Sequence, residues 1–256
     1  MDLGLDGRLY VVGGASRGLG RAVAEALVED GARVVLVARD ANALEQAAGA
    51  LGEHASACAA DVASERGADA VSAAVERAQG DLAGILVNHG GPPLGRALEL
   101  SEQDWRHAFE LVLAGPLRLL RTLVPRLAEG SSVVFVTSSS TRLAVPGLDT
   151  SNVLRPAVAA LVKVLSVELA PRVRVNSLAP GRFRTERGLA VVERRADERG
   201  TTIDDELASQ SRDVPLGRYG EPAEFGRAAA FLLSPAASYV NGQNLLVDGG
   251  LVNALP

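Results

Sequence analysis

Short runs of apolar and β-branched residues alternate along the chain with longer segments in which apolar residues recur at helical spacing. Most of the short runs are continuously apolar rather than alternating, which is typical of strands in a parallel sheet covered on both faces. The alternation predicts repeated strand–helix–strand units. The predicted strands are Leu9–Val12, Arg33–Ala38, Ala55–Ala60, Ile85–Asn88, Val133–Thr137, Val173–Ser177 and Asn244–Val247.

The predicted helices fill the intervals between these strands, and right-handed crossovers through them give a doubly wound α/β sheet. No linker rich in Pro, Gly or Ser separates two cores, and no internal repeat is visible. We therefore expect one domain over residues 1–256. The predicted helices are Gly18–Glu29, Ala41–Leu51, Glu65–Gln79, Glu102–Ala128, Val153–Ala170 and Pro222–Leu233.

The segment 186–212 breaks this rhythm, because it is rich in charged residues and is inserted between the sixth and seventh predicted strands. Two interpretations remain open. The segment is either a solvated surface excursion or a mobile lid over the carboxyl ends of the strands, where open α/β sheets bind ligands. Because long insertions in compact domains are often functional, the lid interpretation has the same weight as the surface interpretation.

Composition narrows the class of function. The 26 basic and 31 acidic residues give a net charge of −5, which lacks the electrostatic footprint of a nucleic-acid-binding protein. Cys58 is the only cysteine, so neither a disulfide framework nor a thiolate metal cluster can form. The chain starts acidic, and no apolar run reaches the roughly 18 residues of a membrane span. We expect a cytoplasmic protein without membrane or nucleic-acid partners.

A glycine-rich turn follows the first predicted strand directly and opens the first helix. Its sequence from Gly13 to Gly20 is Gly-Gly-Ala-Ser-Arg-Gly-Leu-Gly, with the spacing Gly14-x3-Gly18-x-Gly20. Glycines at such a turn let the backbone approach a pyrophosphate, which the helix N-terminus stabilises. The alternative is a tight turn without a ligand, but the strand before it and the helix after it favour dinucleotide binding.

With four further motifs in the right order, the chain resembles the short-chain dehydrogenase/reductase family over essentially its whole length. Within that family it is most similar to the β-ketoacyl-(acyl-carrier-protein)-reductase-like branch, as the segments 215–218 (Pro-Leu-Gly-Arg) and 221–222 (Glu-Pro) indicate. In the fourth-strand motif, histidine stands where the family has alanine. The motifs are Asp61-Val62, Asn88-His89-Gly90, Asn176 with Pro180-Gly181 and Thr185, and Val247-Asp248-Gly249-Gly250.

The resemblance implies a three-layer Rossmann fold with a seven-stranded parallel sheet in the order 3-2-1-4-5-6-7. It also implies a bound nicotinamide dinucleotide and a small carbonyl, alcohol or acyl-carrier substrate. Self-association as a homodimer or homotetramer is expected, because the two longest helices carry apolar residues on more than one face. The implied cofactor-binding residues are Gly14, Ser16, Arg17, Gly18, Leu19, Gly20, Arg39, Asp61, Val62, Asn88, Gly90, Pro180, Gly181, Phe183 and Thr185.

The second strand ends in Arg39 and Asp40, which point to different cofactors. An acidic residue there would bind a ribose 2′-hydroxyl, whereas an arginine accommodates a 2′-phosphate. Arg17 in the glycine turn can approach the phosphate from the other side. Asp40 precedes a helix and is placed to cap it, so we expect NADP(H) rather than NAD(H).

The family's catalytic pattern is only partly present. The family uses a serine, a Tyr-x3-Lys pair and often a helix asparagine. Ser138 matches the serine, but the Tyr-x3-Lys positions fall on Ser151 and Arg155, and the asparagine position falls on Val112. No shifted alignment restores the pair, because no tyrosine lies between Tyr10 and Tyr219 and Lys163 is the only lysine.

Three residues are candidate substitutes. Arg155 can hold ribose hydroxyls but cannot relay a proton. Ser151 is a much weaker acid than tyrosine. His89 titrates near neutral pH and is the most plausible proton source, although a histidine merely packed against the cofactor is the more frequent situation. Pro156 suits a first helical turn, so the helix is expected to start late and to move Arg155 away from the site.

Two functions from different classes therefore remain. The first is an NADP(H)-dependent oxidoreductase, similar to 3-oxoacyl-ACP reductases, with weak activity because the family's tyrosine and lysine are missing. The alternative is a catalytically impaired NADP(H)-binding scaffold or sensor. The fold alone cannot choose between them.

Overall fold

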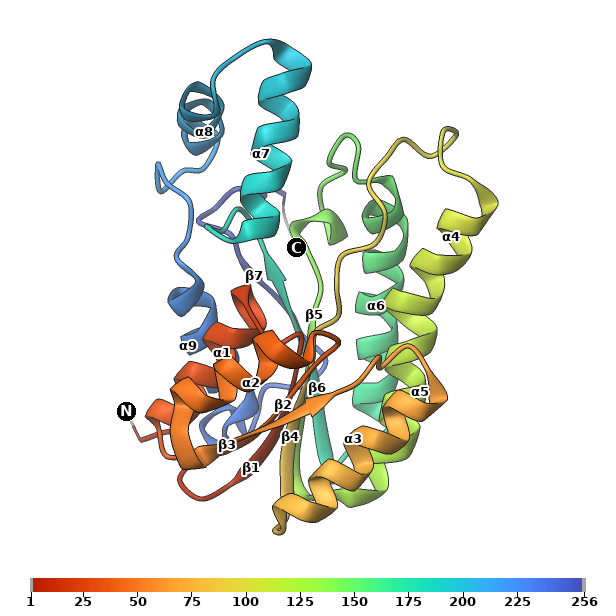
Figure 1. Cartoon of the computed structure of the whole chain (residues 1–256), viewed down its shortest axis with the longest axis vertical. Helices are drawn as coiled ribbons and strands as arrows, with labels where there is room; N and C mark the ends of the chain where they lie inside the picture. Colours follow the sequence, from red (N-terminus) through yellow and green to blue (C-terminus); the bar gives the residue numbers. More distant parts are fainter. Residues whose placement is uncertain (1, 255–256) are drawn as a thin grey trace.

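In the computed structural model, which describes residues 2–254, a parallel sheet runs through the centre of the molecule (Figure 1). Within these residues the sheet has seven strands in the order β3-β2-β1-β4-β5-β6-β7, and every neighbouring pair is parallel. This confirms the predicted fold and strand order. The strands are β1 (Leu9–Gly13), β2 (Arg33–Ala38), β3 (Ala55–Ala59), β4 (Leu82–Val87), β5 (Leu127–Val136), β6 (Val173–Pro180) and β7 (Asn244–Val247).

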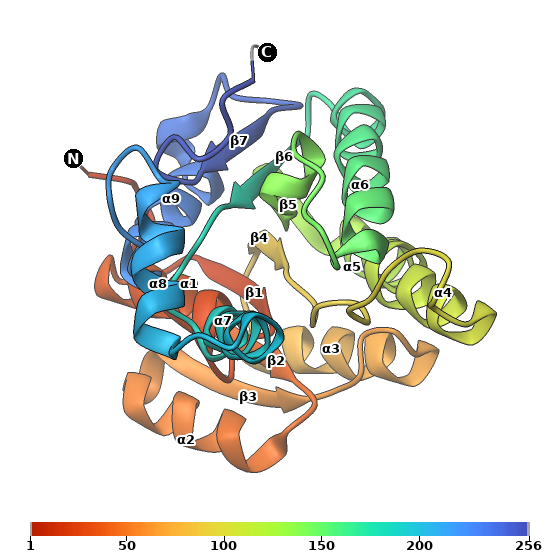
Figure 2. The same ribbon diagram turned by 90° about the horizontal axis from the view of Figure 1, so that it is seen from above.

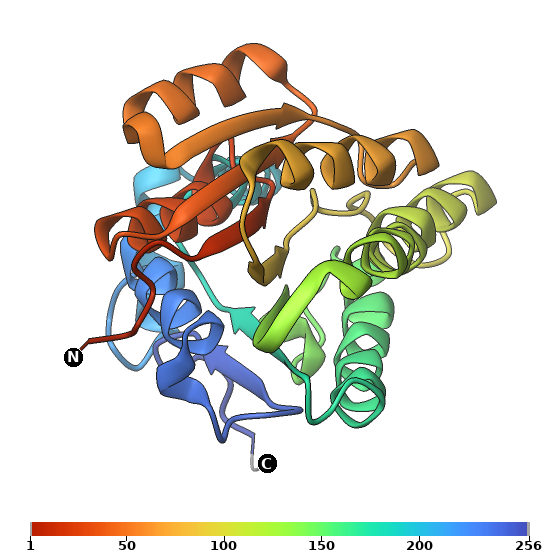
Figure 3. The ribbon, with the colours of Figure 1, turned by 90° about the horizontal axis from the view of Figure 1, so that it is seen from below.

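Two helical layers cover the sheet, as the views from its two ends show (Figures 2 and 3). Successive residues of β2 point to opposite faces, so Val34 packs in the core beneath α1, α2 and α9, and Val35 packs in the core beneath α3, α5 and α6. Burial on both faces explains the continuous apolar runs. These helices are α1 (Gly18–Glu29), α2 (Ala41–Leu51), α3 (Glu65–Ala78), α5 (Gly115–Leu123), α6 (Asp149–Glu168) and α9 (Pro222–Leu233).

The single helix predicted over Glu102–Ala128 is instead a broken helix. It consists of α4 (Glu102–Phe109), a π-helical turn at Glu110–Ala114, α5 and a short 3₁₀ turn before β5. Pro116 in the first turn of α5 has no amide hydrogen to donate to the preceding turn, and such a gap favours a local change of helical pitch. Val112, which we expected at the family's asparagine position, is buried inside the π-helical turn.

Helix α6 begins at Asp149, so the expectation that Pro156 opens this helix was wrong. Pro156 lies in the helix interior. Tertiary contacts hold the earlier start, because the Asp149 carboxylate accepts a hydrogen bond from the Ala97 amide at 2.8 Å. The Asn152 side chain also bonds both backbone groups of Val145. Because α6 starts earlier than expected, Arg155 lies within the helix and lines the cavity, and the expected displacement of Arg155 does not occur.

The charged insertion folds into two helices, α7 (Glu186–Arg199) and α8 (Ile203–Arg212), which stand above the carboxyl ends of the strands (Figure 1). Each helix has a threonine N-cap: Thr185 Oγ1 accepts from the Gly188 amide, and Thr202 Oγ1 accepts from the Asp205 amide, both at 3.1 Å. The segment is thus an ordered pair of helices, and the choice between a solvated surface excursion and a mobile lid stays open.

By length and composition, one helix of the described chain could cross a membrane. This is α6, with a mean hydropathy of 1.2 over its most apolar window. Its buried residues, among them Leu154, Val158 and Val162, face the sheet. A core helix of a globular domain passes the same test.

Candidate active site

A cavity of about 510 Å³ opens at the carboxyl ends of β4, β5 and β6. Its floor comes from the residues that follow these strands, and its walls come from α6, α7 and α8. Parallel α/β sheets bind ligands at this edge, beside the point where the strand order reverses between β1 and β4. The volume suits a small organic molecule.

The glycine turn lies beside this cavity between β1 and α1. Gly14 and Gly18 have φ values of +61° and +59°, which side-chain-bearing residues rarely adopt. A Cβ on Gly20 would collide with the Gly14 carbonyl, so the third glycine allows the helix to pack against the turn. Asn88 Nδ2 donates to the Gly13 carbonyl at 3.1 Å and ties the end of β4 to the turn.

Arginine side chains flank the turn. Arg17 is the N-cap residue of α1, makes no side-chain hydrogen bond to the first turn and is exposed. Its Nη1 pairs with Glu186 Oε2 of α7 at 2.6 Å. Arg39 is also exposed and extends toward Gly90. Asp40 caps α2 by accepting from the Ala43 amide at 3.1 Å, which confirms its predicted role.

The other residues implied to bind a dinucleotide lie around the same edge of the sheet. Asp61 is exposed after β3 and accepts from the Ala63 amide, and Val62 is half-buried beside it. Pro180 ends β6 and Gly181 follows it, and both, like Leu19 and Thr185, line the cavity. Phe183 also borders the cavity. Its ring, however, is buried edge-on against Phe225, with 5.6 Å between the ring centroids.

Three of the candidate catalytic residues meet in the cavity wall. Ser138 follows β5, and Ser151 and Arg155 lie one turn apart on the inner face of α6. Arg155 Nη1 donates to the Val136 carbonyl at 2.7 Å, which holds the guanidinium against the end of β5. Burial and the nearby Arg187 guanidinium lower the pKa of Arg155 to about 10, so it remains cationic at neutral pH.

His89 lines the cavity as well, and its surroundings there favour the neutral imidazole. Burial and the charge of Arg155 lower the pKa of His89 to about 3, and Asp61 offsets this only slightly. Its Nε2 is buried without a hydrogen-bond partner among the described residues. A neutral imidazole with so low a pKa is a poor general acid at pH 7, and the role of His89 as a proton source stays a prediction.

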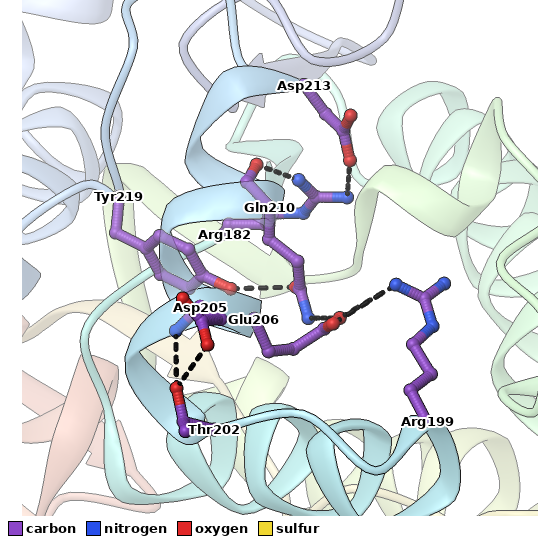
Figure 4. A network of polar contacts seen from close by, with 8 residues as sticks. All are labelled: Arg182, Arg199, Thr202, Asp205, Glu206, Gln210, Asp213 and Tyr219. Atoms are coloured by element: carbon purple, nitrogen blue, oxygen red, sulfur yellow. Dashed lines mark hydrogen bonds and ion pairs between the residues drawn. The ribbon is translucent and has the colours of Figure 1, made fainter.

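Sequence reasoning missed the part of the cavity built by α7, α8 and the segment after them. Arg187 and Arg195 of α7 line the wall, together with Gln210 of α8 and Tyr219. Figure 4 shows Tyr219 donating its hydroxyl proton to Gln210 Oε1, at 2.7 Å. The spacing of Arg187, Val191 and Arg195 at i, i+4 and i+8 could have indicated one face of a helix.

Residues 14–252 match the sequence family described as Enoyl-(Acyl carrier protein) reductase. Galactitol 2-dehydrogenase (L-tagatose-forming) of Cereibacter sphaeroides is 39% identical over 255 residues, which are 96% of this chain and 95% of that protein.

Two solved structures have the same fold. L-Sorbose reductase of Gluconobacter frateurii, complexed with NADPH and L-sorbose, is 30% identical with a TM-score of 0.94 over the full length of both chains. A 3-ketoacyl-(acyl-carrier-protein) reductase of Brucella melitensis, complexed with NADH, is 28% identical with a TM-score of 0.83, covering 97% of this chain and 99% of the other. The chain belongs to the short-chain dehydrogenase/reductase family.

Proposed function

We propose that this protein is an NADP(H)-dependent oxidoreductase that interconverts a small alcohol and the corresponding carbonyl compound. The observation that carries the proposal is the glycine turn, which opens beside a cavity whose wall carries Ser138, Ser151 and Arg155. The names of the relatives, a polyol dehydrogenase and two carbonyl reductases, support this reaction class.

The residues at the turn fit a dinucleotide. A Cβ on Gly14 would meet the Asn88 side chain, and the α1 N-terminus offers backbone amides to a pyrophosphate. Asp61 and Val62 would hold the adenine, and Asn88, Gly90, Pro180, Gly181 and Thr185 would hold the nicotinamide half. The bound dinucleotide supplies or accepts the hydride.

We favour NADP(H) because Arg17 and Arg39 are exposed at the side of the turn where an adenosine 2′-phosphate would lie. Asp40, the residue that would favour NAD(H), is engaged in capping α2. The NADPH in the sorbose reductase structure supports this preference, and the NADH in the ketoacyl reductase structure makes a direct comparison of the two cofactors necessary.

In the reaction, Ser138 would hydrogen-bond and orient the substrate oxygen, with Ser151 next to it. Arg155 would hold the ribose hydroxyls and keep positive charge beside the reacting centre. None of these groups is a good proton donor at neutral pH, because serine hydroxyls are weak acids and the Arg155 pKa is about 10. We expect turnover about 10²–10⁴-fold below that of relatives with an intact tyrosine and lysine.

A second function, an NADP(H)-binding scaffold or sensor without meaningful turnover, is favoured by one observation. The most plausible replacement proton donor, His89, is held neutral. In either function α7 and α8 would form a lid over the cavity, and the exposed apolar residues of α6 would form a contact between copies of the chain.

Titration of NADPH and NADH by fluorescence tests the proposal. We expect NADPH to bind more tightly, and Arg39→Ala to weaken NADPH about tenfold or more while leaving NADH unchanged, because only NADPH carries the 2′-phosphate. Asp40→Ala is the matched control and should not increase NADH affinity. Equal affinities for the two cofactors would contradict the preference, and failure of both cofactors to bind would contradict the proposed function.

A further inference from the structure

The lining of the cavity carries an excess of basic residues although the whole chain is acidic. Its lining within residues 2–254 includes Arg155, Arg182, Arg187 and Arg195, and neither an aspartate nor a glutamate. A cavity lined by one sign of charge with low-dielectric walls concentrates ligands of the opposite sign. The charge of the cavity therefore favours the binding of anionic ligands.

Two acidic residues close to Tyr219 of this wall, Asp213 and Glu206, are already paired with arginines, one of which is the cavity-lining Arg182. Arg182 Nη2 pairs with Asp213 Oδ2 at 3.0 Å, and Arg199 Nη1 pairs with the buried Glu206 at 3.1 Å (Figure 4). Gln210 Nε2 also donates to Glu206, at 2.8 Å. The charges of Asp213 and Glu206 are thus compensated.

Arg195 has no such partner. It is half-buried in the cavity wall and makes no ion pair or side-chain hydrogen bond among the described residues. It lies close enough to the buried Tyr219 for its charge to act on that hydroxyl. A partly buried guanidinium without a counter-charge is costly in a folded protein, and an anionic ligand would remove that cost.

The position of Arg195 separates it from the proposed cofactor site. Arg187 and Arg195 lie on one face of α7, eight residues or about 12 Å apart along the helix axis. Arg187 is in the first turn of α7, next to Glu186, which pairs with Arg17 of the glycine turn, and α7 then rises away from the strand ends (Figure 1). Charge at the first turn can serve a cofactor phosphate, whereas Arg195 lies two turns further along α7, close enough to Tyr219 to act on its hydroxyl.

We infer that Arg195 determines substrate specificity by binding an anionic group, carboxylate or phosphate, carried several bonds away from the carbonyl or alcohol that reacts near Ser138. This inference rests on the proposed function for the place of the reacting centre. Carboxylate and phosphate share the chemistry that a guanidinium recognises, a planar fork of donors facing two oxygens.

Binding measurements on matched pairs of probes test the inference without depending on turnover. The carboxylate pair is 5-oxohexanoate and its methyl ester, and the phosphate pair is dihydroxyacetone phosphate and dihydroxyacetone. Each is titrated into the full-length protein by calorimetry, with and without saturating NADPH. We expect at least one anionic probe to bind about tenfold or more tightly than its neutral partner, also with NADPH present.

The variant Arg195→Met should abolish this preference, and Arg195→Lys should retain part of it because the charge remains. Arg106→Met is the control, because Arg106 is an exposed arginine of α4 outside the cavity. NADPH binding by each variant checks its folding. In the unmodified protein the preference should also decline as salt is raised, while the neutral probes are unaffected.

Equal affinities within both pairs, no binding of either anion at about 10 mM, or a preference that survives Arg195→Met would overturn the inference. Which pair shows the preference identifies the anionic group. The two proposals fail separately: loss of NADPH binding alone contradicts the proposed function, and NADPH binding without an anion preference contradicts only the part assigned to Arg195.

Discussion

Arg17 and Glu186 form an ion pair, with 2.6 Å between Nη1 and Oε2, that joins the glycine turn to the first turn of α7. The Arg17 and Glu186 side chains are 73% and 70% exposed, so the pair contributes at most about 1 kcal/mol to stability. The pair matters for cofactor binding, because Arg17 is the residue that we propose to bind the 2′-phosphate and its side chain is here paired with Glu186.

Replacing Glu186 by glutamine should therefore strengthen NADPH binding. In this variant Arg17 can bind the phosphate without first breaking an ion pair. The free energy of an exposed ion pair corresponds to a gain of about two- to fivefold in NADPH affinity. Fluorescence titration measures the change. Glu193→Gln, elsewhere on α7, is the control and should have no effect. An unchanged NADPH affinity in Glu186→Gln would mean that Arg17 does not reach the phosphate.

The neutral His89 predicts a specific loss of stability in acid. Its pKa is lowered from 6.5 to about 3 in the folded protein, so between these values the unfolded chain binds more protons. The contribution of His89 is fully present above pH 6.5 and declines by roughly 2–3 kcal/mol as the pH falls to about 4.

Urea unfolding between pH 4 and 7 measures this dependence. In His89→Ala the decline should be smaller by that amount, whereas His107→Ala, which removes an exposed histidine of α4, should leave it unchanged. The same steep decline in His89→Ala would show that other groups cause it.

Restoring the family's residues should raise activity if the cavity keeps the geometry of a reductase. In the double variant Ser151→Tyr/Arg155→Lys, a phenol and an ammonium stand one turn apart on the inner face of α6. We expect carbonyl reduction with NADPH to rise about 10²–10⁴-fold on at least one member of a ketone panel. Ser151→Phe/Arg155→Lys lacks only the hydroxyl and should show no gain. No gain in the tyrosine variant would favour the scaffold or sensor function.

Exposed apolar residues on α6 predict self-association. Val164 and Val167 are 59% and 75% exposed and lie three residues apart, so they share one face of the helix. We expect light scattering at micromolar concentration to show a dimer or tetramer, and Val164→Glu/Val167→Glu to reduce the mass. Ile203→Glu, at an exposed apolar position of α8, is the control. A monomer in the unmodified protein would refute the proposed contact.

Much of the fold follows from local sequence. The bounds of α1, α2 and α9 agree with the predicted ones, because glycine turns, caps and helical periodicity act within a few residues. Asp40 capping α2 is such a case. The dinucleotide site could likewise be predicted, because the turn from Gly14 to Gly20 is continuous in sequence and its conformation depends on glycine itself.

Other features arise from contacts between distant segments. The start of α6 is held by the Ala97 amide 52 positions away, which outweighs the preference of Pro156 for a first turn. The His89 pKa depends on burial and on Arg155 of another element. No local pattern reports such long-range effects.

The sequence alone therefore determined the family fold and the glycine turn, and it showed that no tyrosine lies between Tyr10 and Tyr219, since these features reside in contiguous motifs and in composition. Only the tertiary structure decided which side chains surround the cavity. Arg195 and Tyr219 come together because α7, α8 and the segment after them fold back over the strand ends. The partial burial of the Arg195 guanidinium, on which our inference rests, exists only after that packing has formed.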